Sequence, residues 1–96
     1  MAAFQTNRAT ISQDMVTRVG TAAGYAARIQ QEYAMQAESE TVADAREELA
    51  SRARTAAEQA IDAQGITIQD YNRVLTAAET DEDLEERLLD AAREVL

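Results

Sequence analysis

The clearest pattern along the chain is a set of apolar residues that recur at alternating three- and four-residue steps. Between residues 13 and 38 they form a heptad seam over nearly three repeats, which is typical of an amphipathic helix. The seam consists of Met15, Val19, Ala22, Ala26, Ile29 and Tyr33. Two residues fit the N-cap: Thr10, which has capping-box spacing to Gln13, and Ser12. We predict a long helix over about 13–38, preceded by a flexible arm over 1–9.

A second helical pattern follows the segment AESET, in which Ser39 or Thr41 fits the N-cap. Its apolar positions are mostly small: Val42, Ala45, Leu49, Ala53, Ala56, Ala60 and Ile61. Because the connection is short and both seams are long, the two helices are expected to form an antiparallel hairpin. The small residues Gly20, Ala23, Gly24 and Ala27 form a strip on the first helix. It indicates close packing, and we favour the second helix as its partner over a dimer seam.

The stretch that follows contains a helix end and a helix start side by side. Gly65 fits the left-handed position after the second helix, with Ile66 as the apolar residue of a Schellman turn. Thr67 and Asp70 have capping-box spacing. Ile66 and Tyr71 have the spacing of a hydrophobic staple. We therefore interpret Gly65, Ile66 and Thr67 as a structural turn that folds the chain back on the hairpin.

Two shorter helices are expected after this turn. The apolar face of the third helix consists of Ile68, Tyr71, Val74, Leu75 and Ala78. Asp81 or Thr80 fits the N-cap of the fourth, whose inward residues are Leu84, Leu88, Ala91, Ala92 and Val95. The sequence thus predicts an all-α fold over residues 10–96, taken as a single domain. We expect a long antiparallel hairpin with two shorter C-terminal helices packed across it, similar to a four-helix bundle.

The segment GITIQDYNRVLTAAETDEDLEERL resembles the signature of a bacterial family called domain of unknown function 4168. The matching positions are Gly65, Ile66, Thr67, Tyr71, Asn72, Val74, Asp81, Leu84 and Arg87, with Ile11, Ser12, Ala22, Ile29 and Tyr33 upstream. The resemblance covers about residues 11–88. Val19 departs from it where the family usually has Phe, and Glu82 where Pro often opens the last helix. The resemblance implies a helical fold and an exported protein, and it supplies no activity.

Composition adds a thin core and a strongly acidic surface. Alanine contributes 21 of the 44 apolar residues, and it buries little area, so we expect a homodimer or another protein partner. The net charge of −9 disfavours nucleic acid and anionic membrane surfaces, and no apolar run is long enough for a membrane span. Acidic residues without any lysine resemble the bias of salt-adapted bacteria; codon bias explains the same composition equally well.

The absence of His, Cys and Lys excludes most catalytic constellations, so we expect no enzyme activity, no cofactor and no metal. The acidic run Asp81-Glu82-Asp83 lacks the glycine-bent loop of an EF-hand, and a solvated helix N-terminus explains it better. Gly65 between two helices resembles a helix-turn-helix, but the would-be recognition helix offers only Arg73 as a cation.

Tyr71, Asn72 and Arg87 are the candidate recognition patch, for a peptide or a sugar. Each also has a structural interpretation, which we favour. Tyr71 fits the staple, Asn72 fits a hydrogen bond to the backbone of a neighbouring helix, and Arg87 fits an i,i+4 pair with Asp83.

Two functions remain open: a non-enzymatic structural or protein-interaction module, and a small-ligand or stress-protective protein with an apolar groove between helices. We favour the first. The opening MAAFQTNRAT lacks the apolar core of a secretory signal. The resemblance implies an exported or periplasmic protein whose leader is absent from this chain, whereas a native start at Met1 would make it cytoplasmic.

Overall fold

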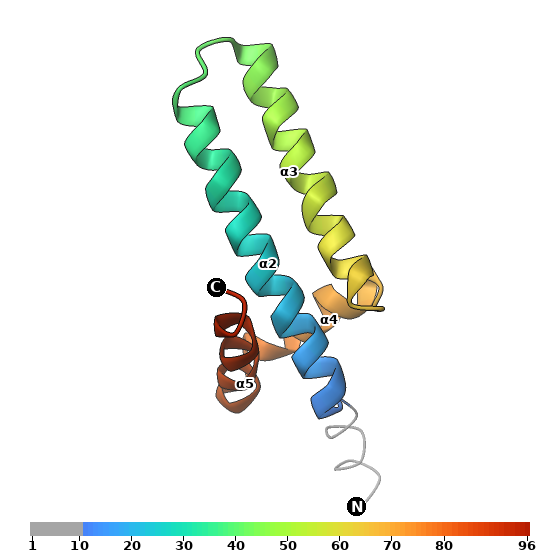
Figure 1. The fold of residues 1–96 in the computed structure, drawn as a ribbon. Helices are drawn as coiled ribbons and strands as arrows, with labels where there is room; N and C mark the ends of the chain where they lie inside the picture. The colour runs from blue at the N-terminus through green and yellow to red at the C-terminus, as the bar shows by residue number, and fades with distance from the viewer. Residues whose placement is uncertain (1–10) are drawn as a thin grey trace, which may run out of the picture.

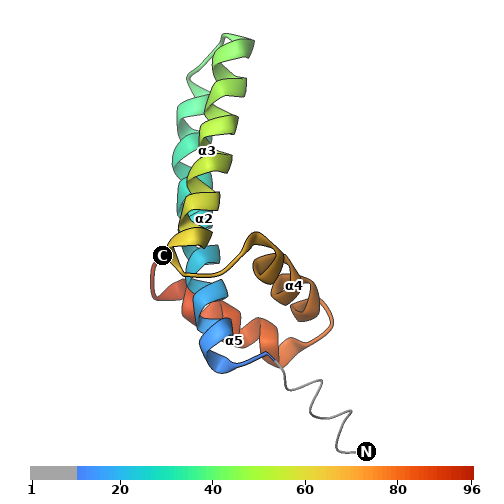
Figure 2. The same cartoon turned by 90° about the vertical axis from the view of Figure 1, so that its right-hand side faces the viewer.

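The computed structural model describes residues 11–96, which form four α-helices and no strand (Figure 1). The helices are α2 (Gln13–Glu38), α3 (Ala43–Ala63), α4 (Ile68–Ala78) and α5 (Glu82–Arg93). α2 and α3 form a long antiparallel hairpin, and α4 and α5 lie across one end of it (Figure 2). The prediction of an all-α fold with this arrangement is confirmed, as is the long helix over residues 13–38.

Side-chain caps fix where α2 and α5 begin. The Ser12 hydroxyl accepts a hydrogen bond from the Met15 N–H at 3.1 Å, so Ser12 is the N-cap of α2. The other candidate, Thr10, and the predicted arm over residues 1–9 lie outside the described residues. At α5 the N-cap is Asp81, whose carboxylate accepts from the Leu84 N–H at 3.1 Å.

The prediction that Ser39 or Thr41 caps α3 is wrong. The N-cap is Val42, whose N–H donates to Glu40 Oε1 at 3.1 Å. Ser39 instead ends α2, with φ −92° and ψ −1°, and its hydroxyl donates to the Gln36 carbonyl at 3.0 Å. A helical backbone at Ser39 continues the turn before it, whereas an N-cap needs an extended conformation.

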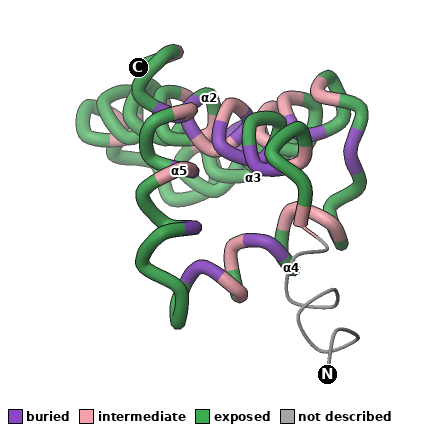
Figure 3. The backbone as a smooth tube through the Cα atoms, turned by 90° about the horizontal axis from the view of Figure 1, so that it is seen from below, coloured by how far each residue is buried: buried purple, intermediate pink, exposed green. Residues whose placement is uncertain are grey.

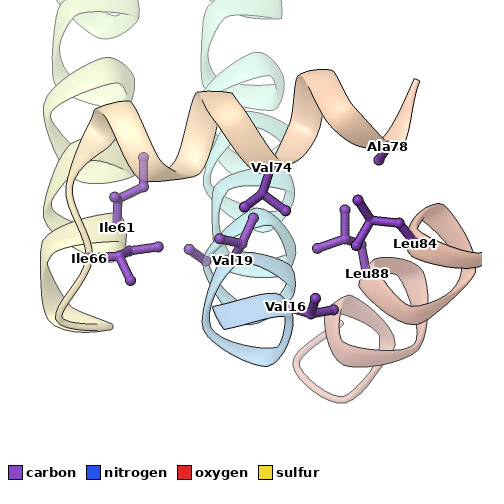
Figure 4. Packing of buried hydrophobic residues seen from close by; sticks show 9 residues of the cluster. Val16, Val19, Ile61, Ile66, Val74, Ala78, Leu84 and Leu88 are labelled. Atoms are coloured by element: carbon purple, nitrogen blue, oxygen red, sulfur yellow. The ribbon is translucent and has the colours of Figure 1, made fainter. Parts of the chain in front are cut away.

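The core lies at the base of the hairpin, where all four helices meet. Val74 points from α4 toward Val19, and Leu84 and Leu88 approach from α5 (Figure 4). The buried cluster consists of Val16, Val19, Ala22, Ile61, Ile66, Val74, Ala78, Leu84 and Leu88. Val16 is fully buried although the predicted seam omitted it. Because α2 contacts α3, α4 and α5, its buried face at the base is wider than a seam for one partner.

Several positions of the predicted apolar faces are open to solvent. Val42 is 57 % exposed and Ile68 is 45 % exposed, so their placement on inward faces is wrong. Val42 lies in the connection at the far tip of the hairpin, and Ile68 is the first residue of α4. Met15, Ala26, Ile29 and Tyr33 of the seam are only partly buried. In Figure 3, α4 and α5 carry both buried and exposed positions, as amphipathic helices on a core do.

The two helical glycines of α2 face α5. A Cβ on Gly20 would lie 2.6 Å from Ala91 Cβ and 2.7 Å from the Leu88 carbonyl oxygen. A Cβ on Gly24 would overlap Val95 and lie 2.6 Å from the Ala92 carbonyl oxygen. The glycines therefore allow close approach of α2 and α5. Close packing at these glycines was predicted with the second helix as the partner, and that prediction of the partner is wrong.

The far part of the hairpin extends beyond α4 and α5 in both views (Figures 1 and 2). We call residues 29–57, which include this far part of α2 and α3, the arm; from here on the name does not refer to residues 1–9. No residue of α2 after Gly24 is buried, and within the arm only Ala53 is, at 9 % exposure. The arm is thus the two-helix end of the hairpin, and it projects from a base in which all four helices pack together.

Candidate functional site

The turn between α3 and α4 contains a left-handed glycine at the position that the sequence predicts. Gly65 has φ +75°, and its N–H donates to the Asp62 carbonyl at 2.9 Å, which is the inner hydrogen bond of a Schellman turn. The outer bond of that motif, from the Ile66 N–H to the Ile61 carbonyl, is not formed within residues 11–96. Ile66 is buried in the core at 6 % exposure. Arg18 of α2 donates to the Gln64 carbonyl at 2.6 Å and thereby holds the turn against α2.

α4 begins directly after this turn with a complete capping box. The Thr67 hydroxyl accepts from the Asp70 N–H at 3.0 Å, and the Asp70 carboxylate accepts from the Thr67 N–H at 3.5 Å. The carboxylate also pairs with Arg73 at 3.2 Å. Gly65, Ile66 and Thr67 thus fix the direction in which α4 leaves α3.

Replacing Gly65 by Ala is expected to cost about 1 kcal/mol or more, because a Cβ is penalised in the left-handed conformation. Chemical denaturation measures the change in the free energy of unfolding. Gly65→Asn is the matched control, since Asn adopts this conformation more readily and should cost less. An alanine variant that unfolds at the wild-type midpoint would contradict this role of Gly65.

Tyr71 packs against the core and is half-buried. Burial penalises the phenolate and raises the pKa of Tyr71 above its ordinary value of 10.0. The unfolded chain therefore loses this proton at a lower pH than the folded protein does. The contribution of Tyr71 to stability is fully present below about pH 10 and is lost as the pH rises through the higher folded-state pKa.

We expect the free energy of unfolding to fall above about pH 10, and to fall less in Tyr71→Phe, which has no proton to lose. Urea denaturation between pH 9 and pH 11 measures both slopes. Tyr25→Phe, at a ring that is 38 % exposed, is the control for the loss of a tyrosine hydroxyl. Equal slopes for the wild type and Tyr71→Phe would contradict the stated effect of burying Tyr71.

Asn72 lies on the exposed side of α4 and makes no side-chain hydrogen bond within residues 11–96. Its predicted bond to the backbone of a neighbouring helix is therefore not formed there. The helical period explains this, because Tyr71 and Val74 take the inward positions of this turn and leave Asn72 outside.

Arg87 connects α5 to the start of α2. Its Nε lies 3.2 Å from Asp83, which is the predicted i,i+4 pair, and its Nη1 donates to Gln13 Oε1 at 3.0 Å. The Nε atom is buried, and the approach to Asp83 is an ion pair without hydrogen-bond geometry. No hydrogen bond within residues 11–96 joins Arg87 to Tyr71 or Asn72. The three patch residues therefore have different contacts: Tyr71 packs on the core, Asn72 faces solvent, and Arg87 contacts Asp83 and Gln13.

The acidic run at the start of α5 serves the helix itself. Asp81 is the N-cap, and Glu82, Asp83 and Glu85 occupy the first turn, where negative charge is favourable. Within residues 11–96 no three His, Cys, Asp or Glu side chains are grouped so as to hold a metal ion. Among the same residues, no helix combines the length and apolar character that crossing a membrane requires.

Sequence reasoning missed the open surface of the arm. Ala34 and Ala37 of α2 line a groove together with Ala50 and Ala53 of α3. The spacing of these alanines was a usable signal, but the sequence does not show which side of the hairpin α4 and α5 leave uncovered.

These features define an all-α protein with a four-helix base, a capped turn that directs α4, and a projecting two-helix arm. The chain belongs to the family described as Domain of unknown function (DUF4168), whose model matches residues 1–88. The resemblance noted from the sequence is thereby confirmed. Comparison with curated proteins gave no match, and comparison with solved structures gave none either.

Proposed function

We propose that this protein is a non-enzymatic interaction module whose arm contacts another polypeptide. The observation that carries the proposal is the lack of covering helices over residues 29–57, where Ala53 is the one buried residue. Partly buried apolar side chains such as Tyr33 and Leu49 lie along this stretch. Covering them removes apolar surface from water, which is the main driving force of protein association.

The chemistry of the chain supports a role without catalysis. It has no His, Cys or Lys, and the raised pKa of Tyr71 belongs to a ring that packs on the core. Active sites usually concentrate perturbed groups in one cleft. Burial alone explains the shift at Tyr71, because the ring packs on the core.

The alternative, a small-ligand protein with an apolar groove, has less support. The hollow beside the turn is lined by Ile61, Ile66 and Ile68 and by five polar residues, including Glu58 and Asp62. The apolar groove of the arm has a volume of only about 140 Å³, less than a drug-sized ligand usually occupies. Small-molecule sites are usually enclosed and mostly apolar, with few polar groups. A hollow with two carboxylates on its rim suits water better than an apolar ligand.

Site-specific photo-crosslinking in cells tests the proposal. A photoreactive residue at exposed Ala34 or Ala50 of the arm is expected to give a discrete adduct. The same residue at exposed Gln69 of α4 is the control and should give none. Adducts from Gln69 and none from either arm position would refute the role of the arm.

For localisation, we propose that the protein acts outside the cytoplasm, since the family resemblance implies exported members. Fractionation of the source cells with an antibody against the chain tests this. A signal confined to the cytoplasmic fraction would contradict it.

A further inference from the structure

Four alanines, Ala34, Ala37, Ala50 and Ala53, line the groove of the arm. Seven residues on one side of the hairpin form a surface that we call the alanine face. It consists of Gln30, Ala34, Ala37, Arg46, Ala50, Ala53 and, one heptad after Ala50, Ala57. Ala34 and Ala50 are exposed. Alanines at these positions allow another helix to approach closely, with little side-chain entropy to lose on contact.

Charged residues on α3 beside this face have no partner within the described chain. Of the arginines in residues 11–96, Arg46 and Arg54 alone take part in no hydrogen bond or ion pair. Glu47 likewise has none there. By contrast, Arg52 on the other side of α3 pairs with Glu48 at 2.8 Å. Asp44, Glu58 and Asp62 of α3 have no side-chain partner within residues 11–96 either. Among these unpaired charges, Glu47 and Arg54 stand three residues before and four residues after Ala50, and therefore on its side of the helix.

Glu47 and Arg54 are related by the symmetry of an antiparallel pair. They are one heptad apart, so they lie on the same side of α3, about 10 Å from each other along the axis. If a second α3 runs antiparallel with its centre between Ala50 and Ser51, each Glu47 lies opposite the Arg54 of the other copy. Because this contact is symmetric, two Glu47–Arg54 ion pairs form, and all four of these charged side chains gain a partner.

This register also fits the shape of the molecule. It brings Ala43, the first residue of α3, opposite Glu58 of the other copy. Ile61, where α3 joins the base core, lies beyond that contact. The pairing therefore uses only the part of the hairpin that α4 and α5 leave free (Figure 2).

We propose that the partner of the arm is a second copy of this chain. The two alanine faces pack antiparallel, with reciprocal ion pairs between Glu47 and Arg54. This inference rests on the proposed function and names its partner.

Sedimentation velocity over a concentration series tests the pairing by charge reversal. The wild type is expected to dimerise, and Glu47→Arg or Arg54→Glu should each raise the dissociation constant about tenfold or more, because each sets like charges opposite one another. The double variant Glu47→Arg/Arg54→Glu restores opposite charges and should return to within about threefold of the wild type. Arg52→Glu, on the other side of the same helix, is the matched control and should leave the dissociation constant unchanged.

Rescue by the double variant distinguishes pairing from a folding defect, and circular dichroism checks that each variant keeps its helix content. A wild type that stays monomeric to millimolar concentration would overturn the inference, as would a double variant no better than the single ones. Arm crosslinks whose mass is not a multiple of the chain would also refute a second copy while leaving the interaction module intact. The absence of any crosslink from the arm would contradict both the second copy as partner and the proposed interaction module.

Discussion

Gly20→Ala and Gly24→Ala are each expected to destabilise the protein by about 2 kcal/mol, although alanine is the better helix former by about 1 kcal/mol. The new Cβ at position 20 would lie 2.6 Å from Ala91 Cβ and 2.7 Å from the Leu88 carbonyl oxygen. A backbone oxygen cannot rotate away as a side chain can. The whole of α5 must therefore move away from α2 to make room for the new Cβ. Chemical denaturation measures the loss, and the double variant should lose about 3 kcal/mol or more.

Gln31→Ala is the control for this series, because Gln31 is an exposed residue of the same helix. Its effect is expected to stay within about 0.5 kcal/mol of the wild type. If either glycine variant were more stable than the wild type, helix propensity would outweigh packing at that site. Such a result would contradict the close approach of α2 and α5 at these glycines.

Leu88→Ala is expected to cost about 3 kcal/mol, within the usual range for a buried leucine. Leu88 is 6 % exposed and lies in the core cluster, where α5 faces α2 and α4. Truncation removes apolar contacts and leaves a cavity that the surrounding helices fill only in part. Urea denaturation gives the change in the free energy of unfolding.

The neighbouring residue supplies a matched control for this prediction. Leu89 is 46 % exposed, so Leu89→Ala makes the same chemical change at the next position and should cost less than about 1 kcal/mol. The comparison also tests the rotation of α5 about its axis. Equal losses for the two variants would mean that α5 packs on the base through a different face.

Local signals in the sequence were sufficient for the helices and the turn. The cap of α4 depends on Thr67 and Asp70, three residues apart, and the turn before it on the left-handed conformation of Gly65. Such interactions depend on few neighbours, so spacing alone predicts them. Ser39 shows the limit of this reasoning, because a serine between two helices suits the end of one and the start of the next.

Features that depend on distant parts of the chain were not predictable in the same way. Gly20 and Gly24 indicated close packing, yet both α3 and α5 were suitable partners until the direction of α4 was known. For the candidate patch, the sequence supplied residue types, whereas the contact of Arg87 with Gln13 depends on where α5 crosses α2.

The central claim is that stability resides in the four-helix base and that the arm becomes protected only when a partner covers it. Native-state hydrogen exchange at increasing protein concentration tests this most directly. In dilute solution, amides of residues 29–57 should exchange faster than those of residues 13–24, and they alone should gain protection as the concentration rises. Arm amides as protected as the base in dilute solution, with no change on concentration, would contradict the account.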